Sequence, residues 1–196
     1  MRLPRFYPIL DTARVPDWPE AALDLASGGA GIVQLRHKGL WTESMLEQAE
    51  RLTRLDPLLI INDRADIAAL LGAGLHVGQT DLPPAEARRL VMGPLGLSTH
   101  NEEQLWRAAR EPVDYVALGP IFPTTSKANP DPVVGCDELR RLRPLVACPL
   151  VAIGGITRAT ATAVLAAGAD AVAVIRDWDE AADRRKRVKE WVQLLK

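Results

Sequence analysis

The sequence predicts a (β/α)₈ barrel, an α/β fold in which eight parallel strands alternate with helices. Short and nearly continuous apolar runs alternate eight times with amphipathic segments along the 196 residues. Such apolar runs are typical of parallel strands that are covered by helices, and eight of these units most simply close into a barrel. A doubly wound open sheet is the alternative, but no G-x-G-x-x-G motif follows the first apolar run, where a dinucleotide-binding fold carries it.

The apolar runs define the predicted strands, which span residues 6–10, 31–36, 58–62, 74–77, 96–98, 113–118, 150–153 and 171–175. The amphipathic segments between them define the predicted helices, which span residues 19–27, 42–54, 65–71, 84–91, 102–110, 137–143, 158–166 and 180–195. Thr42 and Asn101 are suitable helix caps. Gly72 and Gly168 end helices before the next strand. The helices must be brief for this length, and we expect one domain over residues 1–196.

Charge and composition exclude several classes of protein. The net charge is −1, from 24 basic and 25 acidic residues, so the chain has no general basic field for nucleic acid or an anionic membrane. The longest apolar run, at 145–156, is interrupted by Pro149 and is too short to span a bilayer. The two cysteines, Cys136 and Cys148, form neither a disulfide framework nor a metal cluster. We expect a soluble, cytoplasmic protein whose partners are small molecules.

The segment between the sixth strand and the next helix is the most informative part of the chain. It is a long loop with four prolines, in which Thr124, Thr125 and Ser126 precede Lys127. Loops of this length inside compact domains are usually lids or binding loops, and hydroxyl donors beside a compact positive charge suit phosphate oxygens. The alternative is a solvated, proline-rich connector.

Polar side chains also follow one face of the second strand. Gln34, Arg36 and Lys38 alternate with apolar residues, so they share a face at period two. Polar and cationic groups that converge at a barrel mouth are costly unless an anion meets them. This pattern predicts an anion site, with a strand of surface salt bridges as the alternative.

Two carboxylates follow the third and fourth strands, at Asp63 and Asp81. Hard oxygen ligands on neighbouring loops suit Mg²⁺, which takes one or two carboxylates together with water and substrate phosphates. The alternatives are an ion pair of Asp63 with Arg64 and a turn at Asp81 before Pro83. His76, near the end of the fourth strand, is interpreted as structural.

A pair of glycines, Gly154 and Gly155, follows the seventh strand. Paired glycines that open a helix expose backbone N–H groups to an anion, and phosphates in such barrels often bind after strands seven and eight. A tight turn between strand and helix is the alternative.

Six motifs in order resemble the thiamin phosphate synthase family, over residues 6 to about 175. They are Gln34-Leu35-Arg36-x-Lys38, Asn62-Asp63-Arg64, His76-x-Gly78-Gln79-x-Asp81-Leu82-Pro83, Ser98-x-His100, Gly119-Pro120-Ile121-Phe122-Pro123-Thr124-x-Ser126-Lys127 and Ala152-Ile153-Gly154-Gly155-Ile156. The resemblance implies a (β/α)₈ barrel that joins an aminopyrimidine methyl diphosphate to a thiazole phosphate with Mg²⁺ and releases pyrophosphate. In this chemistry the diphosphate leaves first, and the thiazole nitrogen captures the resulting pyrimidine methyl cation.

The resemblance also implies roles for individual residues. The groups that neutralise the diphosphate would be Arg36, Lys38 and Lys127, with Asn62 beside them. The magnesium ligands would be Asp63 and Asp81. The contacts to the pyrimidine or its diphosphate would be Gln34 and Ser98. The contacts to the thiazole phosphate would be Thr124, Ser126, Gly154 and Gly155.

One departure from the family pattern lies at the end of strand eight, where a Ser-Ala-type pair usually helps to bind the thiazole phosphate. Here the chain reads Ile175-Arg176-Asp177. We expect Arg176 to hold the phosphate instead, on the face opposite to Asp177.

Two rival functions stay open. One is a thiazole tautomerase, for which His100 is the candidate catalytic residue, although the presence of Asp81 favours the synthase. The other is a non-catalytic barrel that binds a thiamin precursor. A homo-oligomer is possible.

Overall fold

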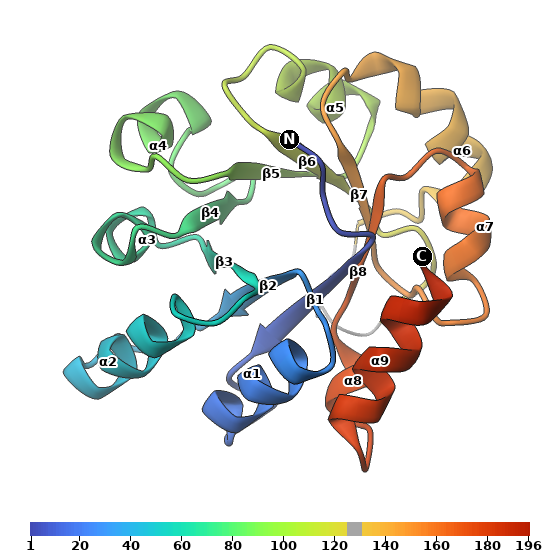
Figure 1. The fold of residues 1–196 in the computed structure, drawn as a ribbon. Coiled ribbons are helices and arrows are strands. Elements are labelled where there is room, and N and C mark those ends of the chain that lie inside the picture. Colours follow the sequence, from blue (N-terminus) through green and yellow to red (C-terminus); the bar gives the residue numbers. More distant parts are fainter. Residues whose placement is uncertain (125–130) are drawn as a thin grey trace.

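The computed structural model of this protein describes residues 1–124 and 131–196. Eight parallel strands form a closed barrel in sequence order, with the helices around the outside (Figure 1). The strands are β1 (Phe6–Asp11), β2 (Ile32–Arg36), β3 (Leu58–Asn62), β4 (Gly74–Val77), β5 (Leu95–Thr99), β6 (Tyr115–Leu118), β7 (Leu150–Ile153) and β8 (Ala171–Val174). The predicted barrel is therefore confirmed, and the open-sheet alternative is excluded because β8 pairs with β1.

The helices follow the strands as the sequence predicts, with one exception near the carboxyl terminus. They are α1 (Trp18–Ser27), α2 (Glu43–Leu52), α3 (Ala65–Leu71), α4 (Pro84–Leu90), α5 (Glu102–Ala108), α6 (Gly135–Leu142), α7 (Ala161–Ala166), α8 (Arg176–Asp179) and α9 (Arg184–Leu194), with a 3₁₀ turn η1 (Arg143–Leu145). The single helix expected at 180–195 was wrong at its start. The chain turns into α8 directly after β8, and α9 begins after Asp183, whose side chain accepts a hydrogen bond from Lys186 N at 2.9 Å.

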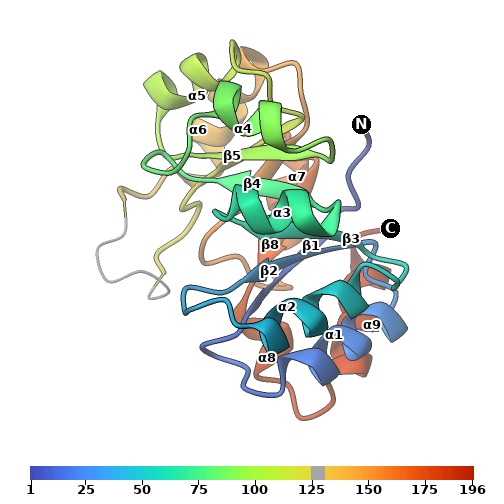
Figure 2. The same ribbon diagram turned by 90° about the vertical axis from the view of Figure 1, so that its left-hand side faces the viewer.

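Two hydrophobic cores hold the barrel together. A small core fills the barrel and includes Tyr7, Ile32, Ile60 and Tyr115. A much larger core lies between the strands and the helices that surround them. Figure 2 shows the ribbons of these helices on the outside of the strands. Since alternate strand residues point to opposite sides, this division of the cores decides which side chains reach the barrel interior. Ile32 belongs to the inner core, so Gln34 and Arg36, at period two from it, face the same side.

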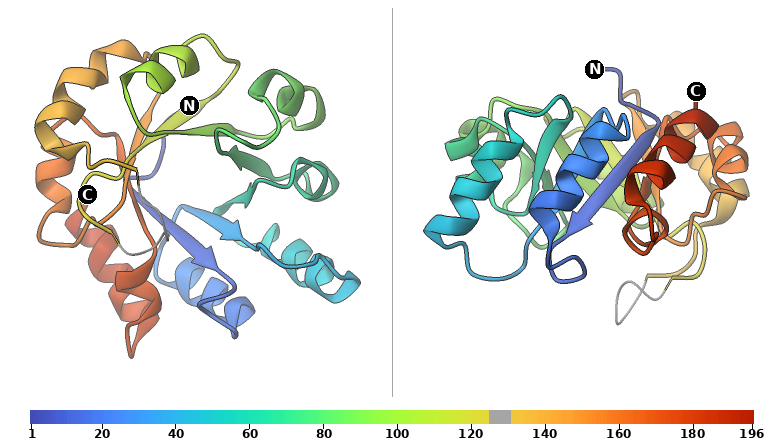
Figure 3. Two further views of the ribbon diagram at one scale, coloured as in Figure 1. Left: turned by 180° about the vertical axis from the view of Figure 1, so that it is seen from behind. Right: turned by 60° about the horizontal axis from the view of Figure 1, so that its bottom comes forward.

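Both chain termini lie at one end of the barrel, where the strands begin (Figure 3). The carboxyl ends of the strands therefore lie at the opposite end, together with the loops that precede the helices. In barrels of this type, functional groups gather at that face. Within the described residues, none of the helices has the length and apolar character needed to cross a membrane.

Candidate active site

A cavity of about 770 Å³ opens at the carboxyl ends of the strands. Its walls combine strand side chains with the loops after β1, β5, β6, β7 and β8. The predicted site residues that line it are Gln34, Arg36, Asn62, Ser98, Thr124, Gly154, Gly155 and Arg176. Three others, Lys38, Asp63 and Asp81, are not among the lining residues and form a separate cluster. Ser126 and Lys127 lie outside the residues that the structure describes.

Arg36 lies at the end of β2 and forms an ion pair with Asp11, which ends the neighbouring strand β1. Asp11 is buried, whereas about a third of the Arg36 side chain is exposed. Asp11 also accepts a hydrogen bond from Ala13 N at 3.0 Å, which fixes the carboxylate at the strand end. The Arg36 guanidinium is thus held at the cavity wall while part of it remains accessible to an anion.

Lys38 forms an ion pair with Asp63, and this contact begins a cluster of three charged groups beside Asn62. The backbone of Asp63 is left-handed, with φ 63°, and its amide donates to the His76 carbonyl at 2.8 Å. Asp81 is held by Gly78, whose amide donates to Asp81 Oδ2 at 2.7 Å. Burial raises the pKa of Asp63, Lys38 lowers it, and the contact with the Asp81 carboxyl raises it again.

Two carboxylates that contact each other are a donor set that suits a divalent cation. Among the described residues, no group of three or more His, Cys, Asp or Glu side chains could hold a metal ion. Mg²⁺ does not require such a group, because it keeps waters and binds through one or two carboxylates plus substrate phosphates. Burial is the main cause of the raised pKa of Asp63, and the neighbouring Asp81 carboxyl adds to it; a bound cation would offset both effects. The chemistry of this donor pair is therefore compatible with a divalent cation.

A chain of hydrogen bonds crosses the floor of the cavity. It runs from Gln34 through Tyr7, Tyr115 and His76 to Ser98. Burial raises the pKa of Tyr7 to about 12 and lowers the pKa of His76 to about 4. The His76 ring also stacks on the Tyr115 ring, with centroids 5.5 Å apart. The floor is thus built from neutral hydrogen-bonding groups and an aromatic surface.

The glycine pair after β7 packs tightly against the first part of the β6–α6 loop. Gly154 and Gly155 have φ values of 96° and 66°, which side-chain-bearing residues rarely adopt. The Gly154 carbonyl accepts from Phe122 N at 3.0 Å, and a Cβ built on Gly155 would lie 2.6 Å from the Pro123 carbonyl oxygen. Glycine is therefore required here by both conformation and space. The prediction that the pair opens a helix was wrong, because helix α7 begins only at Ala161.

Arg176 lies at the cavity mouth, but the argument for its direction was wrong. Strand β8 ends at Val174 and Arg176 is the first residue of helix α8, so period-two alternation does not separate it from Asp177. Asp177 lines the cavity too, and its carboxylate is bound by Arg187, Arg158 and Trp191.

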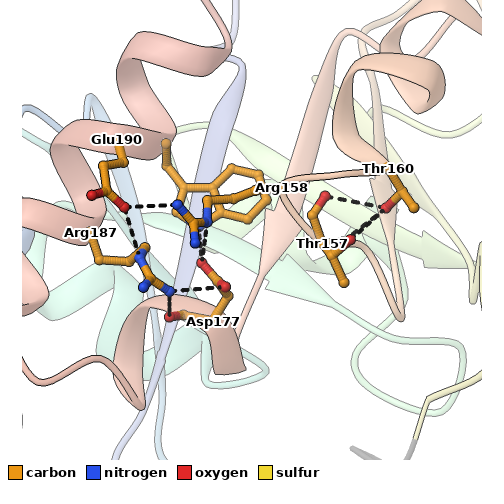
Figure 4. A network of polar contacts seen from close by, with 7 residues as sticks. Thr157, Arg158, Thr160, Asp177, Arg187 and Glu190 are labelled. Carbon is orange, nitrogen blue, oxygen red and sulfur yellow. Dashed lines mark hydrogen bonds and ion pairs between the residues drawn. The ribbon is translucent and has the colours of Figure 1, made fainter.

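Figure 4 shows Arg158, Asp177, Arg187 and Glu190 in one network, beside Thr157 and Thr160. The network joins the β7–α7 loop and helix α9 to the first turn of α8. Within residues 1–124 and 131–196, the exposed Arg176 guanidinium has no hydrogen bond or ion pair. It therefore remains available to an anion at the mouth of the cavity.

His100 also lines the cavity. Its Nδ1 is 2.7 Å from the Gly119 carbonyl oxygen, and a carbonyl can only accept, so Nδ1 carries a proton. Asp131 Oδ2 lies 3.5 Å from the same nitrogen. The other ring nitrogen, Nε2, makes no hydrogen bond with the described part of the chain, which leaves it able to bind a ligand.

Sequence reasoning missed four residues of this site: Asp11, Arg14, Tyr7 and Tyr115. It also set aside His76, which is structural but belongs to the cavity wall. A polar residue at the end of β1 was the available signal for Asp11, and period two from Asp11 leads back through Ile9 to Tyr7. No signal in the sequence pairs Tyr7 with Tyr115, because their contact joins strands that are not neighbours in the barrel.

The fold and the site together define a class of protein: a (β/α)₈ barrel whose cavity at the carboxyl end carries arginines and a glycine loop, with a pair of carboxylates in a separate cluster nearby. A family model described as thiamine monophosphate synthase matches residues 6–177, which is most of the chain. The chain belongs to this family, and the relationship inferred from its motifs is confirmed.

Individual relatives agree with the family match. The chain is 48% identical to the thiamine-phosphate synthase of Koribacter versatilis, with 100% of this chain and 97% of the relative covered. It is 46% identical to that of Chloroflexus aurantiacus over 76% of this chain and 71% of the relative. The solved structure of a thiamine phosphate pyrophosphorylase from Pyrococcus furiosus has a TM-score of 0.86 and 32% identity, with 98% and 95% of the two chains covered.

Proposed function

We propose that this protein is a transferase that joins an aminopyrimidine methyl diphosphate to a thiazole phosphate and releases pyrophosphate. The observation that carries the proposal is one cavity that combines the Arg36 cation, the Gly154–Gly155 loop and the Arg176 cation, with the Asp63–Asp81 pair beside it. The names of the relatives and the family support the same activity.

The proposed reaction breaks the bond between the pyrimidine methylene carbon and the diphosphate oxygen. The electron pair of this bond leaves with the diphosphate, so negative charge grows on the leaving group and positive charge on the methylene carbon. The thiazole nitrogen then forms the new C–N bond with its lone pair. No proton is removed in this sequence, so the site needs groups that stabilise charge and position substrates rather than a general base.

Arg36, Lys38 and Lys127 would stabilise the diphosphate, with Asn62 as a hydrogen-bonding neighbour. Asp11 and Asp63 hold the first two cations in place, and the substrate would share those cations with their carboxylate partners. A magnesium ion on Asp63 and Asp81 would supply further neutralisation of the leaving group. Fixed charges of this kind favour the separated state, where the diphosphate carries its full charge, over the intact substrate.

The second substrate would occupy the opposite side of the cavity. The left-handed Gly154 and Gly155 would present backbone amides, and Arg176 would present a guanidinium, to a phosphate group. Thr124 and Ser126 would add hydroxyl donors from the β6–α6 loop. Gln34 and Ser98 would contact the pyrimidine or its diphosphate from the cavity floor. We further propose cytoplasmic action, and the possible homo-oligomer remains a prediction.

One experiment separates this activity from its rivals. Purified protein is incubated with both substrates and Mg²⁺, and release of pyrophosphate is measured, with each substrate omitted in turn. Release that requires both substrates supports the transferase. Isomerisation of a thiazole carboxylate phosphate without pyrophosphate release would instead establish the tautomerase, with His100 Nε2 as the proton-transferring atom. Binding without turnover of either kind would establish a binding protein.

A further inference from the structure

Five side chains form a continuous hydrogen-bonded chain at the bottom of the cavity. Gln34 Nε2 is 3.0 Å from Tyr7 Oη, which is 2.7 Å from Tyr115 Oη. Tyr115 Oη is 3.0 Å from His76 Nδ1. Ser98 Oγ is 2.8 Å from His76 Nε2. Because Gln34 and Ser98 both line the cavity, the chain begins and ends at groups that a ligand can reach.

The number of protons in the chain is fixed. Burial raises the pKa values of Tyr7 and Tyr115, so each phenol keeps one proton at neutral pH. His76 is buried, and among the described residues its two ring nitrogens form hydrogen bonds only with the Tyr115 and Ser98 hydroxyls. No carboxylate is therefore bound to the ring to stabilise an imidazolium, and the neutral ring carries one proton on one of its two nitrogens. Each phenol and the imidazole therefore donates one hydrogen bond, and the donations must follow one another in a single direction.

The Gln34 amide selects that direction. Its nitrogen donates to Tyr7 Oη, so the Tyr7 proton goes to Tyr115 and the Tyr115 proton goes to His76 Nδ1. His76 then carries its proton on Nε2 and donates to Ser98 Oγ. In the opposite order, both the Gln34 amide nitrogen and the Tyr115 hydroxyl would donate to the Tyr7 oxygen. The Tyr7 proton would then have no acceptor among the described residues. Only a half-turn of the Gln34 amide, which places its oxygen beside Tyr7, would allow that order. A buried donor without a partner is costly.

We propose that His76 is a positioning residue, which holds the Ser98 hydroxyl as a hydrogen-bond donor to the bound substrate. Because Ser98 Oγ already accepts from His76 Nε2, its own proton is directed away from His76 and into the cavity. The floor then selects a substrate atom that accepts, such as a ring nitrogen or a phosphate oxygen, over an N–H donor at that position. The identity of this substrate as the pyrimidine diphosphate rests on the proposed function.

The tautomer of His76 tests the direction of the chain without any substrate. The sequence has three histidines, so a ¹⁵N–¹H long-range correlation spectrum of the intact protein is simple, and the signal missing from His76→Gln identifies His76. We expect Nδ1 without a proton and Nε2 with one, unchanged between neutral and mildly alkaline pH. Tyr115→Phe removes the donor to Nδ1 and should produce a mixture of both tautomers.

Thr99→Val is the matched control for these spectra, since it removes a buried hydroxyl from β5, the strand that carries Ser98. Thr99 Oγ1 donates to the Ala117 carbonyl at 2.8 Å and takes no part in the chain. The His76 signals should be unchanged in this variant. A wild-type His76 protonated on Nδ1 would overturn the proposal, because Ser98 would then be forced to donate to Nε2 and could only accept from a ligand.

Substrate binding tests the consequence for Ser98. His76→Gln places an amide nitrogen near the former Nε2 and can still donate to Ser98, whereas His76→Phe cannot. We expect His76→Phe to bind the pyrimidine diphosphate about two- to tenfold more weakly than His76→Gln, the range for one neutral hydrogen bond, with equal affinities for the thiazole phosphate. Equal pyrimidine affinities of the two variants would refute the role. If wild type binds neither substrate, the proposed function fails, while the tautomer result stands on its own.

Discussion

Replacing Gly155 by alanine should disturb the β7–α7 loop and the phosphate site together. Gly155 has φ 66°, and a Cβ there would lie 2.6 Å from the Pro123 carbonyl oxygen and 2.7 Å from Phe122 Cβ. Real Cβ atoms do not approach neighbours so closely, so either the glycine loop or the β6–α6 loop must move. Both loops line the cavity, so neither can move without changing its shape.

The magnitude follows from comparison with a second left-handed glycine. Gly72 has φ 61°, but a Cβ built there meets nothing within 4 Å. Gly72→Ala therefore costs only the left-handed backbone penalty, about 1–2 kcal/mol. Gly155→Ala bears the same penalty and in addition the overpacking of a closely fitted contact, about 1–3 kcal/mol. The backbone terms cancel in the comparison, so Gly155→Ala should be the less stable variant by about 1–3 kcal/mol.

Urea unfolding of wild type and both variants measures these stabilities, and calorimetry measures the affinity of the folded proteins for the thiazole phosphate. We expect Gly155→Ala to lose both stability and affinity, and Gly72→Ala to lose only stability. Equal destabilisation by the two substitutions, together with unchanged thiazole-phosphate affinity in Gly155→Ala, would show that the close approach of the two loops has no energetic or functional weight.

Three further predictions concern the charged and buried groups of the site. Arg176→Ser should weaken the affinity for the thiazole phosphate more than the affinity for the pyrimidine diphosphate, whereas substitution of the exposed Arg140 by serine, as a control, should change neither. If calorimetry finds that Arg176→Ser binds the thiazole phosphate more tightly, Arg176 hinders binding. Asp81→Asn should lower turnover by orders of magnitude, because it removes a charged metal ligand. Its melting temperature should change little, because the new side chain can still accept from the Gly78 amide. Wild-type activity that persists in EDTA would exclude the magnesium role. The two tyrosines, Tyr7 and Tyr115, should form no phenolate at pH 10, as followed by ultraviolet absorbance, because their folded pKa values are raised. The unfolded chain releases these protons from pH 10 upward while the folded chain keeps them towards pH 12, so stability should fall as pH rises through this interval.

Most of the fold could be predicted from the sequence because each element carries a local signal. Apolar runs mark the strands, and residues such as Asn101 mark helix starts, where its side chain accepts from Gln104 N as a cap should. Period two along β2 correctly placed Gln34 and Arg36 at the cavity. Lys38 lies past the end of that strand, where alternation no longer applies. It therefore does not line the cavity, and its ion pair with Asp63 fixes its position.

The end of β8 could not be predicted because its structure depends on a distant helix. Locally, Ala171 to Ile175 is a continuous apolar run, and period two extended naturally to Arg176 and Asp177. Contacts from α9 override that pattern. Arg187 donates to both the Asp177 carboxylate and the Asp177 carbonyl oxygen at 3.1 Å, and Trp191 Nε1 donates to the carboxylate at 2.6 Å.

These contacts pair the Asp177 carboxylate with Arg187 and Arg158, although Asp177 remains among the residues that line the cavity. An anion at the cavity mouth would therefore meet a carboxylate whose charge is balanced by arginines, and not one that faces the opposite side. The Arg176 charge is available because α9 holds the neighbouring carboxylate, so Arg187 should affect the phosphate site without contacting it. Arg187→Ala should release Asp177 and weaken the affinity for the thiazole phosphate. Arg185→Ala, on the same helix, should leave that affinity unchanged. If calorimetry finds that both variants bind as wild type does, Arg176 does not depend on α9 for its role.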